Sequence, residues 1–376
     1  MKALLTALLA SALLAALSAP AGAQDRLGEI TYLENDLTVV RNNQAVEPAG
    51  VEIGMEIQNL DLLKTGRTGY VEVGLDDPQS ATIRVSPGTT FYLEQGVVGK
   101  GRRTSVGAIT GSIAVKVQKL GANQQVQVAS ESALMGVRGT TFEVTLSPSG
   151  DLLVTCAEGE VVCREEGGGE VSAVPGSVVA QPAGEGFQSV PVSVSDLARF
   201  RQEWYAERLE VLKANPLKAI RFYALRYAAL RDRFNRAYAA LGRERQVLQK
   251  WYDEDRRGQV GGNMEILREK RRLIGHLLEL RKVLFLFERV YFRLSELQEY
   301  YRQGYGEGTL ESGLTSRAFF QAFDRDRAVL ERQMAEVRYA TKLFAKRNQG
   351  AFPTERAEEG EQDFFGNEDL GEEEDL

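Results

Sequence analysis

The chain has 376 residues, of which 43% are hydrophobic and 26% are charged, and its net charge is -7. This balance is typical of globular proteins and excludes a membrane-embedded or wholly disordered chain, while the length exceeds what one core usually serves, so we expect two domains. The charge is uneven: residues 24–194 have a net charge of -9, residues 195–350 of +11 and residues 351–376 of -10.

Residues 1–23 have the features of a secretory signal peptide. Lys2 supplies a positive charge, Ala3 to Ala19 is an apolar run, and Ala21-Gly22-Ala23 offers the small residues of a cleavage site. The alternative is a membrane anchor, for which the run is short. We therefore expect export, a mature chain that begins near Gln24, and a periplasmic location, with secretion as the alternative.

Residues 24–194 are predicted to form an all-β domain. Short runs of alternating or β-branched residues, such as Gly69 to Val73 and Gln125 to Val128, are bounded by Gly, Pro, Asn or Asp. The pattern favours a partly open barrel, a sandwich or a short β-solenoid, and it disfavours the parallel architecture of nucleotide-binding folds.

Residues 195–350 are predicted to be helical. After a first helix that ends near Asn215, three stretches carry apolar residues at heptad spacing, with one polar break at Glu244 in the first stretch. Short segments at Asp253–Asn263 and Gln303–Leu314 separate them, which indicates antiparallel neighbours. We expect an antiparallel coiled-coil bundle, a rod of about 50–60 Å.

Residues 351–376 are predicted to be a disordered acidic tail, because they lack any apolar period. Phe364-Phe365 within it is either a short docking anchor or an ordinary aromatic pair. The opposite charges of the tail and of residues 195–350 raise the hypothesis that the tail folds back onto the basic helices until a partner displaces it.

Motifs between residues 28 and 176 carry a resemblance to a known family. In chain order they are Gly28-Glu29-Ile30, Asp61-Leu62-Leu63-Lys64-Thr65-Gly66, Ser86-Pro87-Gly88-Thr89, Gly111-Ser112-Ile113, Val137-Arg138-Gly139-Thr140-Thr141-Phe142-Glu143-Val144, Glu158-Gly159-Glu160-Val161 and Pro175-Gly176. This ordered set resembles the FecR domain family. The resemblance implies a β fold and a place in the cell envelope.

We expect most of these motif residues to be structural. A positive φ is expected where strands turn, at Gly66, Gly139, Gly159 and Gly176. Thr65 and Thr140 are suited to hydrogen-bonding the turn backbone, and Phe142 and Val144 share a strand face that should enter the core. Arg138 either buttresses a turn or binds a carboxylate of a partner.

The resemblance implies less about signalling. The members of the family that regulate iron uptake carry an anti-sigma segment and a membrane span before this domain, and a small docking domain after it. In the present sequence a signal peptide leads directly into the FecR-like region, and helices follow. What the resemblance implies is a periplasmic interaction module.

The cysteines and the single histidine are the remaining candidates for chemistry. A two-residue turn at Gly159-Glu160 would place Cys156 opposite Cys163, so they form either a cross-strand disulfide or two half-buried thiols. His276 flanks the apolar seam of a predicted helix without a local catalytic motif, and it is interpreted as a histidine at the edge of the bundle. No metal site is expected from two cysteines alone.

We therefore expect a non-catalytic protein without a cofactor. The main hypothesis is an envelope adaptor or scaffold, whose FecR-like domain binds an envelope protein or glycan and whose helical rod sets spacing or self-associates. The alternative is a periplasmic signalling receptor or regulator for an outer-membrane transporter. Nucleic acid is not an expected partner. The positive charge of the helical region would allow weak contact with an anionic membrane surface.

Overall fold

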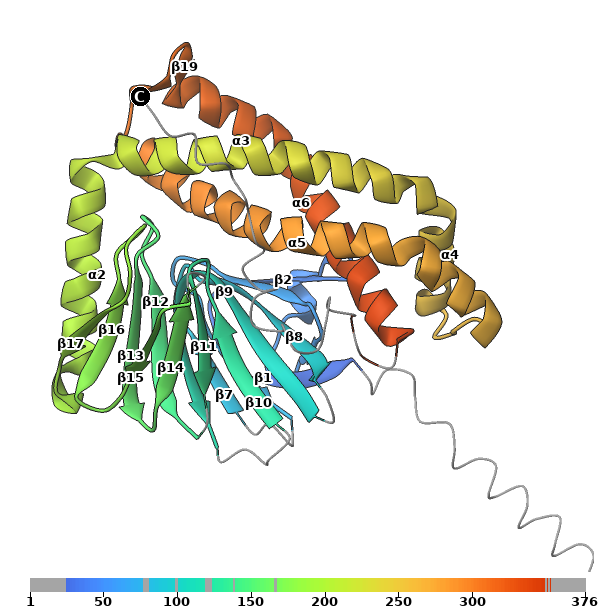
Figure 1. Ribbon diagram of the computed structural model, residues 1–376, viewed down its shortest axis with the longest axis horizontal. Coiled ribbons are helices and arrows are strands. Elements are labelled where there is room, and N and C mark those ends of the chain that lie inside the picture. Colours follow the sequence, from blue (N-terminus) through green and yellow to red (C-terminus); the bar gives the residue numbers. More distant parts are fainter. Residues whose placement is uncertain are drawn as a thin grey trace, which may run out of the picture.

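The computed structural model describes residues 25–76, 81–98, 101–118, 124–137, 139–165, 168–348, 350 and 352. It has two parts, a β domain and a set of long helices that lie across it (Figure 1). This order of an all-β region followed by helices is the one that the sequence predicts.

The β domain is a sandwich of two sheets that share one long strand, β9 (Gly101–Val117). The first sheet has the spatial order β4 (Glu56–Gln58), β1 (Arg26–Glu34), β6 (Tyr70–Leu75), β7 (Ala81–Val85), the end of β9, β12 (Thr141–Leu146), β13 (Leu152–Glu158), β16 (Ser177–Gln181) and β17 (Gln188–Pro191). The second has the order β3 (Gln44–Ala45), β2 (Leu37–Arg41), β5 (Leu62–Thr65), β8 (Thr90–Val98), the start of β9, β10 (Gln124–Ala129), β11 (Ala133–Val137), β14 (Val161–Glu165) and β15 (Glu170–Ala173).

Strand β9 changes sheets at Gly111. Residues before it pair with β8 and β10, and residues after it pair with β7 and β12. Gly111 has a φ of +81°, and a Cβ atom there would lie 2.2 Å from the Thr89 hydroxyl oxygen. Only glycine fits this bend without strain. Of the three predicted architectures the structure is therefore the sandwich, and the described strands do not close into a barrel.

The alternating residues of both sheets meet in one apolar core. Ile30, Val73, Ile83 and Val115 come from the first sheet and Phe91 from the second, and all are almost completely buried. This is the period-2 pattern that the sequence shows. The alternation therefore specifies the inner faces of the sandwich.

The helices are α2 (Leu197–Ala214), α3 (Pro216–Leu241), α4 (Arg245–Arg256), α5 (Asn263–Arg302) and α6 (Ser316–Lys346), with a hairpin of β18 (Thr309–Glu311) and β19 (Leu314–Thr315) before α6. Short 3-10 turns occupy Pro48–Gly50, Val194–Asp196 and Gly242–Glu244. The last of these divides the second predicted helix into α3 and α4, at its polar break. None of the helices in these ranges has the length and apolarity that a bilayer crossing requires.

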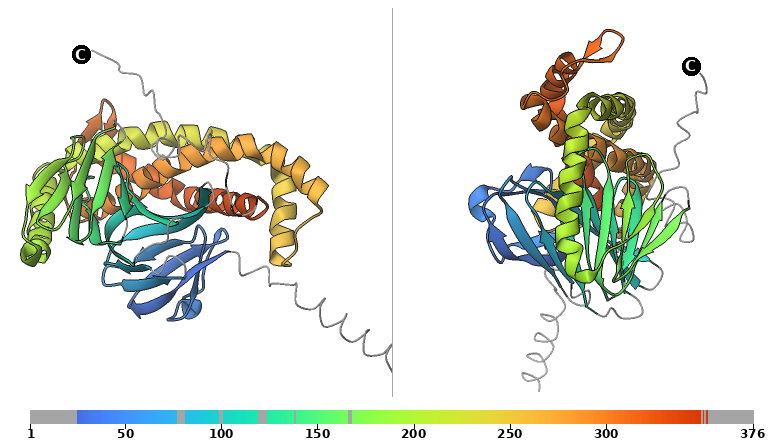
Figure 2. Two further views of the ribbon diagram at one scale, coloured as in Figure 1. Left: turned by 60° about the horizontal axis from the view of Figure 1, so that its bottom comes forward. Right: turned by 90° about the vertical axis from the view of Figure 1, so that its left-hand side faces the viewer.

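The helices lie across one end of the sandwich and against parts of its outer faces (Figures 1 and 2). Helix α2 packs beside β13, β16 and β17, where Leu197 joins a small core with Leu153 and Val178. The long helices share a core with the outer face of the second sheet. There the Tyr92 ring lies 5.6 Å from the ring of Phe285, and it fits because Gly107 opposite it has no side chain.

The apolar heptad positions are the buried ones, and α3 and α5 run antiparallel, since Arg233 pairs with Glu279 and Arg272 with Glu244. The bundle is not a rod that stands apart, however. Its seam faces partly onto the β sheet because Leu62, Tyr92 and Ile109 present apolar side chains on the outer face of that sheet.

Candidate functional site

The first FecR-like motif holds turns in place. The carboxylate of Asp61 is 1% exposed and accepts hydrogen bonds from Arg41 Nη2 at 2.6 Å and from the backbone N–H of Gln58 at 2.8 Å. The Thr65 hydroxyl donates to the carbonyl oxygen of Ser86 at 2.8 Å and accepts from the backbone N–H of Thr89 at 2.9 Å. These residues stabilise backbone, as predicted for Thr65.

The motif glycines are required for two different structural reasons, a positive φ or close packing. Gly139, Gly159 and Gly176 have φ values of +62°, +84° and +98°, as expected. Gly66 is not among the positive-φ residues. A Cβ atom on Gly66 would instead lie 2.8 Å from the Cβ atom of Asp36, so close packing explains the glycine there.

The second motif is also largely internal. Phe142 and Val144 are 3% and 1% exposed and contribute to the sandwich core, as predicted. The Thr140 hydroxyl is buried and has no hydrogen-bond partner among the described residues, unlike the expectation for it. Arg138 lies outside the described residues, as does the Phe364-Phe365 pair.

The predicted hairpin register of the cysteines is wrong. Cys156 lies on β13 in the first sheet opposite Phe142, and Cys163 lies on β14 in the second sheet opposite Met135. The turn at Gly159 therefore carries the chain between sheets. Both thiols are unbonded and buried, and burial raises the pKa of Cys163 to about 12.

Residue Leu60 marks a junction that the sequence motifs did not reveal. It has a φ of +63°, which is rare for a residue with a Cβ atom. Its side chain lines a small cavity of about 20 Å³ with Tyr92 of β8, Phe285 of α5 and Thr341 of α6. The turn before Asp61 thus places an apolar side chain between the sheet and two helices.

Opposite charges join the two parts of the chain. Arg281 of α5 pairs with Glu94 of β8 at 2.7 Å, and Arg201 of α2 pairs with Glu143 of β12 at 2.5 Å. The buried Arg293 donates to the carbonyl oxygen of Ser147. Part of the positive charge of the helices therefore forms ion pairs with carboxylates of the acidic β domain.

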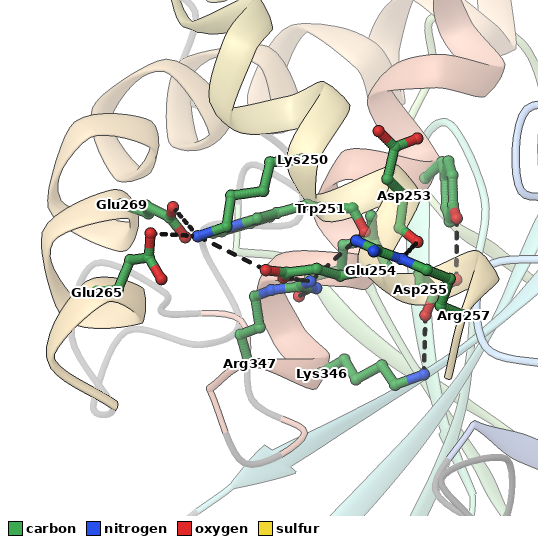
Figure 3. Close-up of polar contacts among 12 residues, drawn as sticks. Lys250, Trp251, Asp253, Glu254, Asp255, Arg257, Glu265, Glu269, Lys346 and Arg347 are labelled. Carbon is green, nitrogen blue, oxygen red and sulfur yellow. Dashed lines mark hydrogen bonds and ion pairs between the residues drawn. The ribbon is translucent and has the colours of Figure 1, made fainter. Parts of the chain in front are cut away.

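A polar network fastens α4 to α5 (Figure 3). Lys250 Nζ lies 2.6 Å from a carboxylate oxygen of Glu265 and 2.7 Å from one of Glu269. The indole N–H of Trp251 donates to the other oxygen of Glu269 at 2.8 Å. Burial alone would lower the pKa of Lys250, but the hydrogen bonds to the two glutamates raise it.

The same network extends to the end of α6 and to Asp25, the residue before β1. Arg347 donates to Glu254 at 2.8 Å, and its guanidinium lies 4.5 Å from the centre of the Trp251 ring. Lys346 pairs with Asp255 at 2.9 Å and with Asp25 at 3.5 Å. Each of these charged side chains has a partner of opposite charge, so the network connects α4, α5 and α6 to one another.

A cleft of about 250 Å³ lies where turns at one end of the sandwich face α3. On one wall Glu131 pairs with Arg226 at 3.1 Å and accepts from the Tyr223 hydroxyl at 3.3 Å. Phe222 is 48% exposed on the α3 side. Both regions of the chain thus contribute to the walls.

The strand ends and turns that line the cleft also carry hydrogen-bond acceptors. The side-chain oxygen of Gln181 is buried there and has no hydrogen-bond partner among the described residues. Asp151 fixes the rim by accepting from Ser149 at 2.7 Å and from the backbone N–H of Ala183 at 3.0 Å. Burial alone would raise the pKa of Asp151, but these bonds and that from Ser147 lower it. The cleft is a preformed hollow whose walls carry both polar and aromatic side chains.

His276 remains at the edge of the helical layer. It is half-buried on α5 beside the buried Leu273 and Leu280. The cleft residues were not among the sequence candidates, because they come from four turns and a helix that are distant in the chain. Only the exposed aromatic at position 222 of an otherwise regular helix could have drawn attention to them.

Comparisons with known proteins agree with the motifs. Residues 61–162 match the model of the family described as FecR protein. Two solved structures named "putative anti-sigma factor", both from Parabacteroides distasonis ATCC 8503, show 13% identity with a TM-score of 0.32, over 38% of this chain and 64% of theirs. The search of curated proteins finds no match. Residues 61–162 are thus similar to the FecR family, in the region where the ordered motifs predicted it.

Proposed function

We propose that this chain is a non-catalytic regulator in cell-envelope signalling, exported to the periplasm, which binds a protein partner through the cleft. The observation that carries the proposal is the match of residues 61–162 to the FecR family. The cleft supports it, because a FecR domain and helices that are fastened together offer one preformed surface for a partner. The partner class is an envelope protein such as an outer-membrane transporter.

The adaptor hypothesis has less support. It depended on a helical rod free to set spacing or self-associate, and α3, α5 and α6 use their apolar seam against each other and against Leu62 and Tyr92 of the sheet. A regulator needs no such free seam. The regulatory alternative is therefore the one that we carry forward.

Site-specific crosslinking in cells tests the proposal. A photoreactive amino acid replaces Ala183 or Phe222 at the cleft, and for the control it replaces Val329, which is 45% exposed on α6. We expect cleft-specific adducts with an outer-membrane transporter or with a membrane regulator of a sigma factor. Adducts only with the chain itself or with peptidoglycan-associated scaffold proteins would contradict the regulator and favour the adaptor.

Export has its own test. Residues 1–23 lie outside the described residues, so the signal peptide remains a prediction from the sequence. We expect mass spectrometry of the protein isolated from the envelope fraction to give an N-terminus near Gln24. An intact N-terminus at Met1 would contradict cleavage.

A further inference from the structure

The end of the helical layer at the junction of α4 and α5 carries an unusual surface. We call residues 256–272 the helical tip. It extends beyond the edge of the sandwich in Figure 1 and in the left-hand view of Figure 2. A flat surface could therefore approach the tip without first meeting the β domain.

Apolar side chains are exposed on the helical tip. Met264 is 69% exposed, Val260 is 50% exposed and Leu267 is 43% exposed. Met264 and Leu267 are three residues apart on α5, so they share a face of that helix. No described residue covers this face, whereas the opposite side of α5 contributes Leu273 and Leu277 to the core.

The same face carries cations without partners. The helical tip contains six basic and two acidic residues, a net charge of +4. Both acidic residues, Glu265 and Glu269, are engaged by Lys250. The exposed Arg268 and Arg271 have neither an ion pair nor a side-chain hydrogen bond within the described ranges, and they lie one helical turn from Met264 and Leu267.

We propose that the helical tip docks on an anionic phospholipid surface, with Met264 and Leu267 inserted among the acyl chains and Arg268 and Arg271 against the phosphates. Apolar side chains next to unpaired arginines are the pattern of helices that lie at a membrane interface. Each arginine close to an anionic surface strengthens the binding, and burial of the apolar side chains adds to it. This inference does not depend on the identity of the protein partner.

The cleft and the helical tip lie at different ends of the helical layer. The cleft involves Phe222 and Arg226 of α3, whereas the tip begins at the last residue of α4. Docking through the tip would leave the cleft open to a partner at the same membrane. The two contacts are thus compatible.

Co-sedimentation of the full chain with vesicles tests the proposal. The probe is vesicles of mixed phosphatidylglycerol and phosphatidylethanolamine, and vesicles of phosphatidylcholine provide the comparison. We expect binding to the anionic vesicles only, and its weakening by high salt. The variants Arg268→Gln/Arg271→Gln and Met264→Asp/Leu267→Asp should each lower the partition coefficient about tenfold or more.

The matched control carries Arg325→Gln and Val329→Asp, which change an exposed arginine and an exposed valine on α6. It should bind like the wild type, and thermal unfolding should show that all variants fold. Equal binding by the tip variants and the control would overturn the proposal. It would also be overturned if neither the full chain nor a chain without residues 353–376 bound the anionic vesicles. Binding that appears only without these acidic residues, and that Met264→Asp/Leu267→Asp abolishes, supports the lipid surface and identifies the tail as its cover.

Discussion

The sandwich and the helical layer are stabilised in different ways. Between the sheets the core is apolar almost throughout, with strands that contribute alternate side chains. The helical layer instead buries many charged side chains, namely Glu254, Glu269, Glu288, Arg289, Arg293, Arg338, Lys342 and Arg347. An apolar side chain in a core can pack against any apolar neighbour of suitable size, whereas a buried charge requires a partner of opposite charge. The buried charged pairs therefore determine how the helices are positioned.

The buried pair of Glu288 on α5 and Arg338 on α6 should give the largest effect. Burial raises the pKa of Glu288 despite the attraction of Arg338, which indicates that desolvation outweighs the pairing. Arg338→Met should lower the free energy of unfolding by about 3–5 kcal/mol, because it leaves a buried carboxylate unpaired. Urea unfolding measures it.

The double variant Glu288→Leu/Arg338→Met sharpens the same comparison. Replacing both charges should restore wild-type stability to within about 1 kcal/mol or exceed it. Arg332→Met, at an exposed position of α6, is the control and should change stability by less than about 0.5 kcal/mol. A double variant as unstable as the single one would mean that the pair does more than satisfy its own charges.

The sandwich core should respond to lost volume alone. Ile83 on β7 is completely buried, and Ile83→Ala should lower the free energy of unfolding by about 2–5 kcal/mol. Lys64→Ala, at an exposed position on β5, should have little effect. Because Leu62 and Tyr92 belong to the helical core, we expect circular dichroism of sheet and helix to report one transition. Two separate transitions would show that the parts unfold independently.

Asp61 should give an intermediate effect at the junction of the two regions. Asp61→Ala removes the acceptor of the Arg41 guanidinium and of the Gln58 N–H, and unfolding in urea should show a loss of about 1–3 kcal/mol. Glu52→Ala, an exposed residue nearby, should be neutral. An equal loss in both variants would contradict a specific role for the motif aspartate.

The smallest expected effect is a pH dependence at Asp255. Burial alone would raise its pKa, but the hydrogen bond and charge of Lys346 and the hydroxyl of Tyr339 lower it. A carboxyl whose pKa is lower in the folded state stabilises the fold above its unfolded pKa of about 3.9 and loses that contribution as the pH falls.

Urea midpoints measured from about pH 5 downward should therefore fall more steeply for the wild type than for Asp255→Asn. The control is Glu311→Gln in the β18–β19 hairpin, a carboxylate without an ion pair in the described part of the chain. It should follow the wild type. Parallel curves for all three proteins would exclude Asp255 as a source of acid lability.

The sequence predicted what depends on local period. The alternation gave the β domain and the burial of Phe142, and the heptads gave the buried faces of the helices, because one side of each element must avoid water. It did not predict what depends on distant contacts. The cysteine register was wrong because a turn between two sheets has the same local residues as a hairpin turn.

The cleft was missed for a similar reason. Glu131, Gln181 and Phe222 meet only because α3 lies over the end of the sandwich, and nothing near any of them in the chain records that approach. The break at Glu244, in contrast, was visible in the sequence as a polar position in the apolar stripe. The sequence did not show whether the helix ends there or continues with a charged residue in the stripe. In the structure the helix ends there.

Strand β9 has a consequence for how the domain opens. Its first part is hydrogen-bonded to β8 and β10 and its last part to β7 and β12, so one continuous backbone is central to both sheets. Amide protons of the two sheets should therefore exchange with solvent in a common event, since neither sheet can lose its middle strand while the other keeps it whole. A pull on either sheet is likewise transmitted along a single strand to the other.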